Sequence, residues 1–223
     1  MGKFIVIEGL DGSGKTTQGK LLASRLRSEG RKVRELSFPC YGEKSATLVE
    51  MYLGGELGAS PSDTNGYAAS MLYAADRYVS FVTDWKKDIE DEETIVLATR
   101  YTTANAYHQL SKLPESEWES FLSWLYDFEF HKIGLPRPDC VVLLSMNQEI
   151  SSANVKDRSE KTGQKMDIHE KDRDYLLRCR DAAYYAAEKD GWHIIECAPE
   201  GSLLSIEAIN DKIREALNDR IAR

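Results

Sequence analysis

The sequence predicts an α/β fold in which a parallel sheet of about five strands lies between two layers of helices. Two observations predict it: short apolar runs alternate with longer amphipathic stretches, and a glycine-rich segment directly follows the first apolar run. The 223 residues, of which 42% are hydrophobic and 30% charged, suffice for one domain with its own core. Because no linker divides the chain, we expect residues 1–223 to form a single domain.

The expected strands are five short apolar runs, at residues 4–7, 33–38, 94–98, 139–145 and 192–196. Unbroken runs such as TIVLA at 94–98 are typical of central parallel strands, which are buried on both faces. Between the strands we expect helices at residues 19–28, 66–89, 115–130, 167–190 and 202–221. In residues 115–130, aromatic and leucine side chains recur at helical spacing, which we interpret as core or subunit packing.

Charge and cysteine content exclude several classes of function. The formal net charge is −8, so the chain lacks the broad basic field with which proteins bind nucleic acid or anionic membranes without sequence preference. The four cysteines are scattered without a CxxC pair, which favours reduced thiols and a cytoplasmic protein. No run approaches the ~18 apolar residues of a membrane span. We therefore expect neither nucleic acid nor a membrane as a partner.

The segment GLDGSGKT at residues 9–16 fits the phosphate-binding pattern G-x-x-x-x-G-K-S/T, between an expected strand and a helix that begins near Lys15. Glycines let successive backbone N–H groups point at phosphate oxygens, Lys15 brings a charge to the β- and γ-phosphates, and the Thr16 hydroxyl is a ligand for Mg²⁺. The chain is therefore expected to bind a nucleoside triphosphate, and the guanine signature N-K-x-D of GTPases is absent from the sequence. The expected residues of this site are Gly9, Leu10, Asp11, Gly12, Ser13, Gly14, Lys15, Thr16 and Thr17.

Two arginine clusters bear on the acceptor of the phosphoryl group. Tyr73 and Arg77 are four residues apart in the long expected helix, so they share one face of it. A ring that stacks on a base, beside a guanidinium that binds a phosphate, suits a nucleoside monophosphate; a solvated Tyr–Arg pair is the alternative. Arg100 and Tyr101 directly follow the strand at 94–98, and ligands bind at the carboxyl ends of strands in open α/β sheets.

Together these motifs resemble those of the thymidylate (dTMP) kinase family. The resemblance rests on FIVIEGLDGSGKTTQ at residues 4–18, Phe38-Pro39, Tyr73 with AADR at 74–77, Arg100-Tyr101, Asn105 and Gln109. It implies the three-layer α/β/α fold of phosphate-loop kinases with a mobile lid. It also implies ATP-dependent phosphorylation of dTMP to dTDP for dTTP synthesis, by Mg²⁺-assisted in-line transfer. A homodimer is implied as well, through the helix that carries Asp76-Arg77-Tyr78.

The resemblance also assigns roles to single residues. Asp11 would help to position the acceptor phosphate, Arg77 and Arg100 would hold it, and Arg100 would stabilise charge on the transferred group. The thymine pocket, the stacking aromatic and the residues that bind the base and check the sugar complete the implied acceptor site. Its residues are Asp11, Phe38, Pro39, Leu53, Tyr73, Arg77, Arg100, Asn105, His108 and Gln109. The implied catalytic residues are Lys15, Arg100, Asp11 and Arg158.

The lid follows from the resemblance because family members without an arginine in the phosphate loop supply a cation from a mobile segment. Residues 154–169 fit, since Lys156, Arg158, Lys161 and Lys165 surround Thr162-Gly163. Positive charge that closes over the γ-phosphate stabilises the transition state and excludes water. Arg158 is the first candidate, with Lys161 and Lys165 next; a solvated charged loop is the alternative.

Departures from the family pattern leave alternatives open. The family usually has an aspartate where this chain has Thr99, and a neutral side chain gives Mg²⁺ and the transferring group less electrostatic support. Ala104 replaces a common serine, and His108 stands where many members have tyrosine. The chain is therefore expected to phosphorylate dTMP, to use another pyrimidine monophosphate, or to be a catalytically weakened nucleotide-binding protein.

Overall fold

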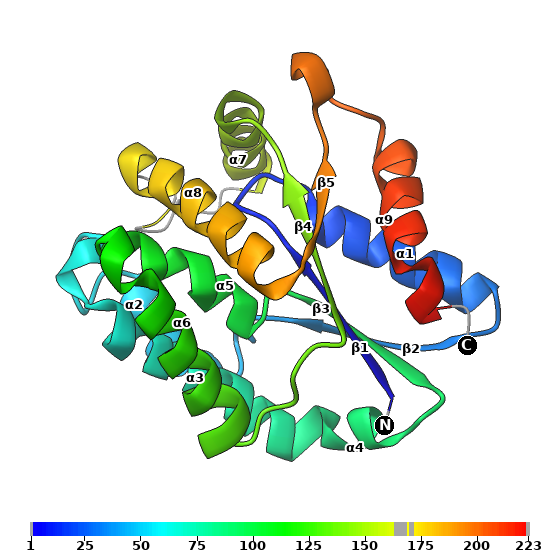
Figure 1. The fold of residues 1–223 in the computed structure, drawn as a ribbon, viewed down its shortest axis with the longest axis horizontal. Coiled ribbons are helices and arrows are strands. Elements are labelled where there is room, and N and C mark those ends of the chain that lie inside the picture. The colour runs from blue at the N-terminus through cyan, green and yellow to red at the C-terminus, as the bar shows by residue number, and fades with distance from the viewer. Residues whose placement is uncertain (1, 163–168, 170–171, 222–223) are drawn as a thin grey trace.

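The computed structural model of the chain describes residues 2–162, 169 and 172–221 (Figure 1). Its centre is a sheet of five parallel strands in the order β2-β3-β1-β4-β5. The strands are β1 (Lys3–Glu8), β2 (Lys32–Ser37), β3 (Thr94–Thr99), β4 (Cys140–Ser145) and β5 (His193–Glu196). The five strands predicted from the sequence are confirmed, each end within one residue.

Helices cover both faces of the sheet, as Figure 1 shows, so the predicted three-layer α/β/α fold is confirmed. One face packs against α1 (Lys15–Ser28) and α9 (Ile206–Ile221), which also contact each other. The core on the other face includes side chains of α4 (Lys86–Glu90), α5 (Thr102–His108), α6 (Trp118–Tyr126) and α8 (Arg173–Asp190). Farther out, α3 (Gly66–Ser80) packs on α5 and on α2 (Thr47–Leu53).

Strand β1 shows how the sequence separates the two cores. Successive side chains of a strand point to opposite faces, and every residue from Phe4 to Ile7 is apolar and buried. Phe4 and Val6 join the core formed with α4, α5 and α8, whereas Ile5 and Ile7 join the core formed with α1 and α9. A strand buried on both faces has to be an unbroken apolar run, which is the pattern that predicted it.

The helix predicted at 66–89 is continuous but not uniform. It runs through α3, a π-helical turn at Phe81–Trp85 and then α4. A second π-helical turn, Asp127–Lys132, extends α6, and α7 (Gln148–Thr162) precedes the part of the lid that lies outside the described residues. Short 3₁₀ turns lie at Lys44–Ala46, Pro61–Asp63, Leu110–Lys112, Glu115–Glu117 and Pro199–Gly201.

The sheet brings the predicted motifs together at one edge. Ile7 of β1 pairs in register with Thr99 of β3, and Glu8 pairs with Leu143 of β4. The phosphate loop, which follows Glu8, and Arg100, which follows Thr99, therefore begin at neighbouring points of the carboxyl edge. Within the described ranges, no helix has both the length and the apolar character needed to span a bilayer.

Candidate active site

The phosphate loop runs from the end of β1 into the first turn of α1. Gly9, Gly12 and Gly14 have φ values of 153°, 82° and 82°, a region of backbone space that other residues rarely adopt. At Gly12 there is also no room for a side chain, because a Cβ atom would lie 2.1 Å from the carbonyl oxygen of Ser151 in α7. The loop therefore favours glycine at all three positions, of which the sequence pattern fixes Gly9 and Gly14.

Lys15 lies buried inside this loop. Its amine donates to the carbonyl of Leu10 over 3.2 Å and lies 3.3 Å from a carboxylate oxygen of Asp11. Burial and the nearby charge of Arg100 lower the pKa of Lys15 to about 8, although Asp11 acts in the opposite direction. The amine is thus placed to exchange its contact with Asp11 for phosphate oxygens.

The residues at the loop fit Mg²⁺ that arrives with a nucleotide. Thr16 and Thr17 are exposed in the first turn of α1, so the Thr16 hydroxyl is accessible. Among the described residues no group of three or more His, Cys, Asp or Glu side chains is placed to hold a metal ion. A magnesium site that consists of one hydroxyl plus nucleotide phosphates and water agrees with this donor set, because Mg²⁺ rarely occupies all-protein cages.

Arg100 connects the phosphate loop to α5. Its φ of 65° lies in the left-handed region, which costs a non-glycine residue ~1–2 kcal/mol. Its guanidinium forms an ion pair with Asp11 and lies 3.1 Å from Nε2 of His108. Burial alone would raise the pKa of Asp11, but the charges of Arg100 and Lys15 outweigh it and hold that pKa well below its usual range. Asp11 is therefore an ionised carboxylate fixed between two cations.

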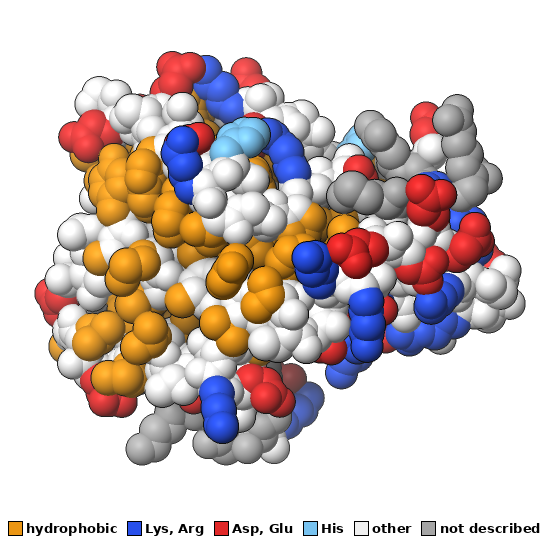
Figure 2. Space-filling model, turned by 90° about the horizontal axis from the view of Figure 1, so that it is seen from below, with side chains coloured by type: hydrophobic (Ala, Val, Ile, Leu, Met, Phe, Trp, Pro, Cys, Tyr) orange, Lys and Arg blue, Asp and Glu red, His pale blue; other side chains and the backbone are white. Residues whose placement is uncertain are grey.

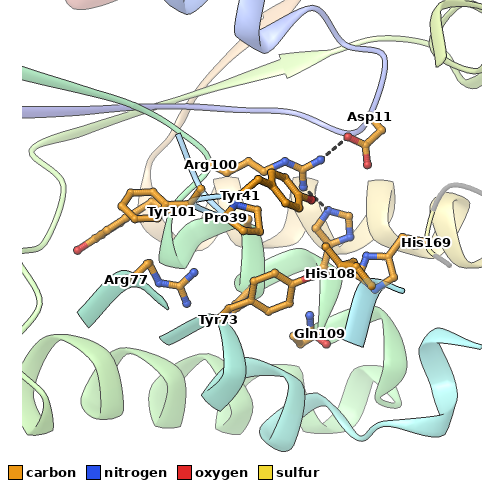
Figure 3. A pocket seen from close by; sticks show the side chains of 14 residues that line it. Asp11, Pro39, Tyr41, Tyr73, Arg77, Arg100, Tyr101, His108, Gln109 and His169 are labelled. Atoms are coloured by element: carbon orange, nitrogen blue, oxygen red, sulfur yellow. Dashed lines mark hydrogen bonds and ion pairs between the residues drawn. The ribbon is translucent and has the colours of Figure 1, made fainter. Parts of the chain in front are cut away.

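A cavity opens beside Arg100 (Figure 3). The predicted acceptor residues all line it: Asp11, Phe38, Pro39, Leu53, Tyr73, Arg77, Arg100, Asn105, His108 and Gln109. Tyr41, Tyr101, Ala104 and His169 line it as well, and none of these four is among the acceptor residues predicted from the sequence. In Figure 3, Arg100 and Asp11 point toward each other at one end, while Tyr73 and Arg77 reach the cavity from α3.

Arg77 is held more tightly than the sequence suggested. It is buried, and its Nε and one terminal nitrogen donate to the two carboxylate oxygens of Glu129, over 2.8 and 2.5 Å. Burial opposes the charge of Arg77, but Glu129 outweighs this effect and raises the pKa above its usual value. One edge of the guanidinium fork is thus taken by Glu129, so the same edge is not open to an acceptor phosphate.

The wall around His108 is formed by neutral rings. His108 stacks on His169 with centroids 5.3 Å apart, and Nε2 of His169 lies 2.8 Å from the hydroxyl of Tyr52. Burial is the main reason that the pKa of His169 falls to about 3, and it also drives the pKa of His108 well below its usual value. Lys112 donates to the Tyr52 hydroxyl over 2.9 Å and has a pKa lowered by burial to about 8. His169 ends the segment predicted as the lid, and no sequence pattern indicated that it lines this cavity.

Thr99 lies at the end of β3 but not in the acceptor cavity. It is 9% exposed, and its methyl group faces Gly19 of α1, where a Cβ atom would lie 2.8 Å from it. Glu8 at the end of neighbouring β1 is fully buried, and it accepts bonds from the Tyr101 amide and from the hydroxyls of Thr103 and Tyr107. Glu8 and Glu129 are the two carboxylates that sequence reasoning missed.

The described part of the lid packs on the phosphate loop. Asn154 of α7 donates to the carbonyl of Gly12 over 2.8 Å. Lys161 pairs with Asp157 within α7 over 2.7 Å, and both are exposed. Lys165 lies outside the described residues, as does the side chain of Arg158, so the lid cations predicted there stay predictions.

Comparisons with known proteins agree with this geometry. A family model described as thymidylate kinase matches residues 7–213. The chain is 33% identical over 192 residues to the thymidylate kinase of Mycobacterium tuberculosis, a match that covers 85% of this chain and 87% of that protein. It is 32% identical over 166 residues to a probable thymidylate kinase of Thermococcus gammatolerans, which covers 73% and 74% of the two chains.

A solved structure extends the likeness to the fold. The thymidylate kinase of Candida albicans superposes with a TM-score of 0.71 over 98% of this chain and 92% of that chain. At 19% sequence identity this match concerns the fold alone.

Proposed function

The chain belongs to the thymidylate kinase family, and we propose that it transfers the γ-phosphoryl group of ATP to dTMP, forming dTDP. One observation carries the assignment: the Arg100–Asp11 pair joins the phosphate loop directly to a cavity lined by every predicted acceptor residue. A donor and an acceptor held on either side of this pair react in line, without a covalent intermediate on the protein. The alternatives, another pyrimidine monophosphate or a weakened nucleotide-binding protein, are not favoured.

On the donor side, the loop residues from Gly9 to Thr17 bind the phosphates of ATP. Backbone N–H groups and the start of α1 stabilise the negative charge, and Lys15 turns from Asp11 toward the β- and γ-phosphates. Mg²⁺, when bound, neutralises developing charge on the phosphates, and Thr16 is the residue that would hold it. Arg158, Lys161 and Lys165 add cations from the lid, with Arg158 the first candidate.

On the acceptor side, Arg100 grips the dTMP phosphate while Asp11 keeps the guanidinium aimed at the loop. Tyr73 stacks on the base, Phe38, Pro39 and Leu53 form its apolar surroundings, and Asn105 and Gln109 supply polar contacts. Both polar atoms of the Gln109 amide are buried without a hydrogen-bond partner, which supports a ligand contact there. Because Glu129 takes the Nε edge of Arg77, we assign the contact of Arg77 with the acceptor phosphate to its remaining Nη donors.

The proposal also covers the domain organisation, the oligomeric state and the cellular compartment of the protein. Residues 1–223 form one domain, since both cores pack on the same sheet. Two copies form a homodimer through α3 and the neighbouring apolar helices. None of the four cysteines forms a disulfide, which is consistent with a reducing compartment and hence with the cytoplasm.

A panel of acceptors tests the function. Purified protein is incubated with Mg-ATP and dTMP, dUMP, CMP, UMP or AMP, and diphosphate formation is followed by chromatography. We expect the highest kcat/KM with dTMP. Robust product from another monophosphate with none from dTMP would reject the assignment.

A further inference from the structure

Two fully buried carboxylates flank the start of α5. Glu8 comes from the end of β1 and Glu129 from the π-helical turn after α6, and both are 0% exposed. Two consecutive threonines of α5 each donate a hydrogen bond to one of these carboxylates. Thr102 donates to Glu129 over 2.7 Å, and Thr103 donates to Glu8. A buried carboxylate is costly unless several donors compensate it, so each one constrains the groups that surround it.

Glu8 constrains the end of the site where the phosphoryl group moves. It accepts a 3.0 Å bond from the backbone N–H of Tyr101, the amide that follows the left-handed residue Arg100. It also accepts a 2.9 Å bond from the Tyr107 hydroxyl, which lies 3.3 Å from the carbonyl of Gly9 in the phosphate loop. One carboxylate thus links the loop, the Arg100 turn and α5.

Glu129 constrains the other end of the same cavity. It binds Arg77 through two bonds, and the Asn105 side-chain nitrogen lies 3.3 Å from one of its oxygens. Arg77 and Asn105 both line the acceptor cavity, one from α3 and one from α5. This carboxylate therefore sets the relative position of two acceptor contacts and has no bond to the phosphate loop among the hydrogen bonds of the described residues.

We propose that Glu8 and Glu129 are positioning residues with separate tasks: Glu8 aligns Arg100 and the phosphate loop for transfer, and Glu129 aligns Arg77 and Asn105 for acceptor recognition. The proposal rests on the proposed function, because it assigns the two carboxylates to the two ends of that reaction. Both carboxylates are fully buried and neither lines the acceptor cavity, so each acts through the groups it holds.

The kinetic consequences differ between the two carboxylates. Loss of alignment at the transfer end lowers kcat, whereas loss of a contact made equally in ground and transition states raises KM. For Glu8→Gln we expect kcat to fall about tenfold or more, while the KM for dTMP changes less than about threefold. For Glu129→Gln we expect the opposite split, with the KM for dTMP raised about tenfold or more.

The adjacent threonines supply milder, matched variants in case a glutamine variant does not fold. Thr103→Val and Thr102→Val each remove one hydroxyl donor from one carboxylate at nearly constant volume. We expect the first to lower kcat and the second to raise the dTMP KM, each by about threefold or more. Affinity for dTMP without ATP, measured by calorimetry, is expected to fall only in the Thr102 and Glu129 variants.

The outcomes separate the proposal from a purely structural role and from the function itself. If the Glu8-side and Glu129-side variants change the same kinetic parameter, or change only the midpoint of thermal unfolding, the separate tasks are overturned. The unmodified enzyme in the same assay tests the function independently, since absence of dTDP there rejects the kinase assignment whatever the variants do.

Discussion

Arg100 combines two unfavourable features, one in its backbone and one in its side chain, and its neighbours compensate the second. Its backbone adopts the left-handed region, and its side chain, which is 20% exposed, places a charge next to a second cation, Lys15. Asp11 offsets the repulsion by pairing with both. When phosphates enter, they take over part of this neutralisation, so the site exchanges an internal carboxylate for substrate oxygens rather than exposing bare charges.

This arrangement predicts that ATP affinity depends on pH through Lys15. In the free protein the pKa of Lys15 is about 8, so the amine loses its proton as the pH rises through 8. Bound phosphates favour the charged form, so the apparent Kd of Mg-ATP is expected to rise, by up to about tenfold per pH unit above pH 8. Calorimetric titration between pH 7 and 9.5 measures the slope.

Lys112 supplies the control for this experiment, because its pKa is also about 8 but it lies on the acceptor side. Lys112→Met is expected to retain the pH dependence of ATP binding. An affinity that stays flat across this range would contradict the assignment of the titration to Lys15.

Thr99 leads to a second prediction at this scale. Its methyl group faces Gly19 and the residue does not line the acceptor cavity, so we expect its hydroxyl to be dispensable for transfer. Thr99→Val is expected to keep kcat within about threefold of the unmodified enzyme. Thr99→Asp is expected to gain less than about tenfold in kcat and to lower the melting temperature, because it buries a charge. A larger gain in steady-state turnover would instead mark Thr99 as a catalytic lesion.

At the scale of elements, the sequence predicted what depends on apolar runs and missed what depends on tertiary contacts. The five strands and the long helix from residue 66 were predictable because their burial repeats along the chain. Helix α5 was not, because all seven of its residues are buried and no polar face marks a helical period. Helix α7 was missed for the opposite reason, since its residues are largely polar.

The residues of the candidate site also fall into those that the sequence predicted and those that it did not. The predicted acceptor residues belong to motifs, so much of the lining of the acceptor cavity could be predicted. Glu8, Glu129 and His169 contact other side chains across 24 to 117 positions of sequence, and no local pattern reports such pairs. The pairing of Arg77 with Glu129 is the clearest case, because it leaves only the remaining Nη donors of Arg77 for the acceptor.

The contact between α7 and the phosphate loop predicts an unequal effect of two glycine substitutions. Gly12 and Gly30 have nearly the same φ, 82° and 80°, but a Cβ at Gly12 meets the Ser151 backbone whereas a Cβ at Gly30 meets nothing within 4 Å. Gly30→Ala is expected to lower the free energy of unfolding by about 1 kcal/mol, through backbone strain alone. Gly12→Ala has the same backbone strain and must also displace α7, so it is expected to lower the free energy of unfolding by at least about 2 kcal/mol.

Urea denaturation measures both costs, and calorimetry measures the accompanying loss of ATP affinity. That loss is expected for Gly12→Ala only, since Gly30 lies outside the site. Equal costs in the two variants would show that α7 does not rest on the loop in solution.

At the scale of the whole molecule, the outer side of α3 is unusually apolar. Tyr67, Met71, Tyr78, Val79 and Val82 of α3 and the following turn are 39–54% exposed. Figure 2 shows apolar side chains gathered on the face seen from below. An apolar patch of this kind on a folded protein marks an interaction site, and the same helix carries Tyr73 and Arg77 into the acceptor cavity. A second copy packed on this face would hold α3 in place from outside while the nucleotide binds from inside.

Met71→Glu tests this arrangement, because Met71 is 54% exposed near the middle of the apolar face. A charge buried in a self-complementary interface is repeated in both copies and is not compensated, so the variant is expected to be monomeric. Leu203→Glu, at an equally exposed position before α9, is the control and is expected to leave the dimer intact. Sedimentation equilibrium gives the mass of each variant.

If α3 depends on its partner for support, the monomeric variant also has a dTMP KM raised by about threefold or more, with the KM for ATP unchanged. A dimeric Met71→Glu protein would place the interface elsewhere and would leave the apolar face of α3 to another partner.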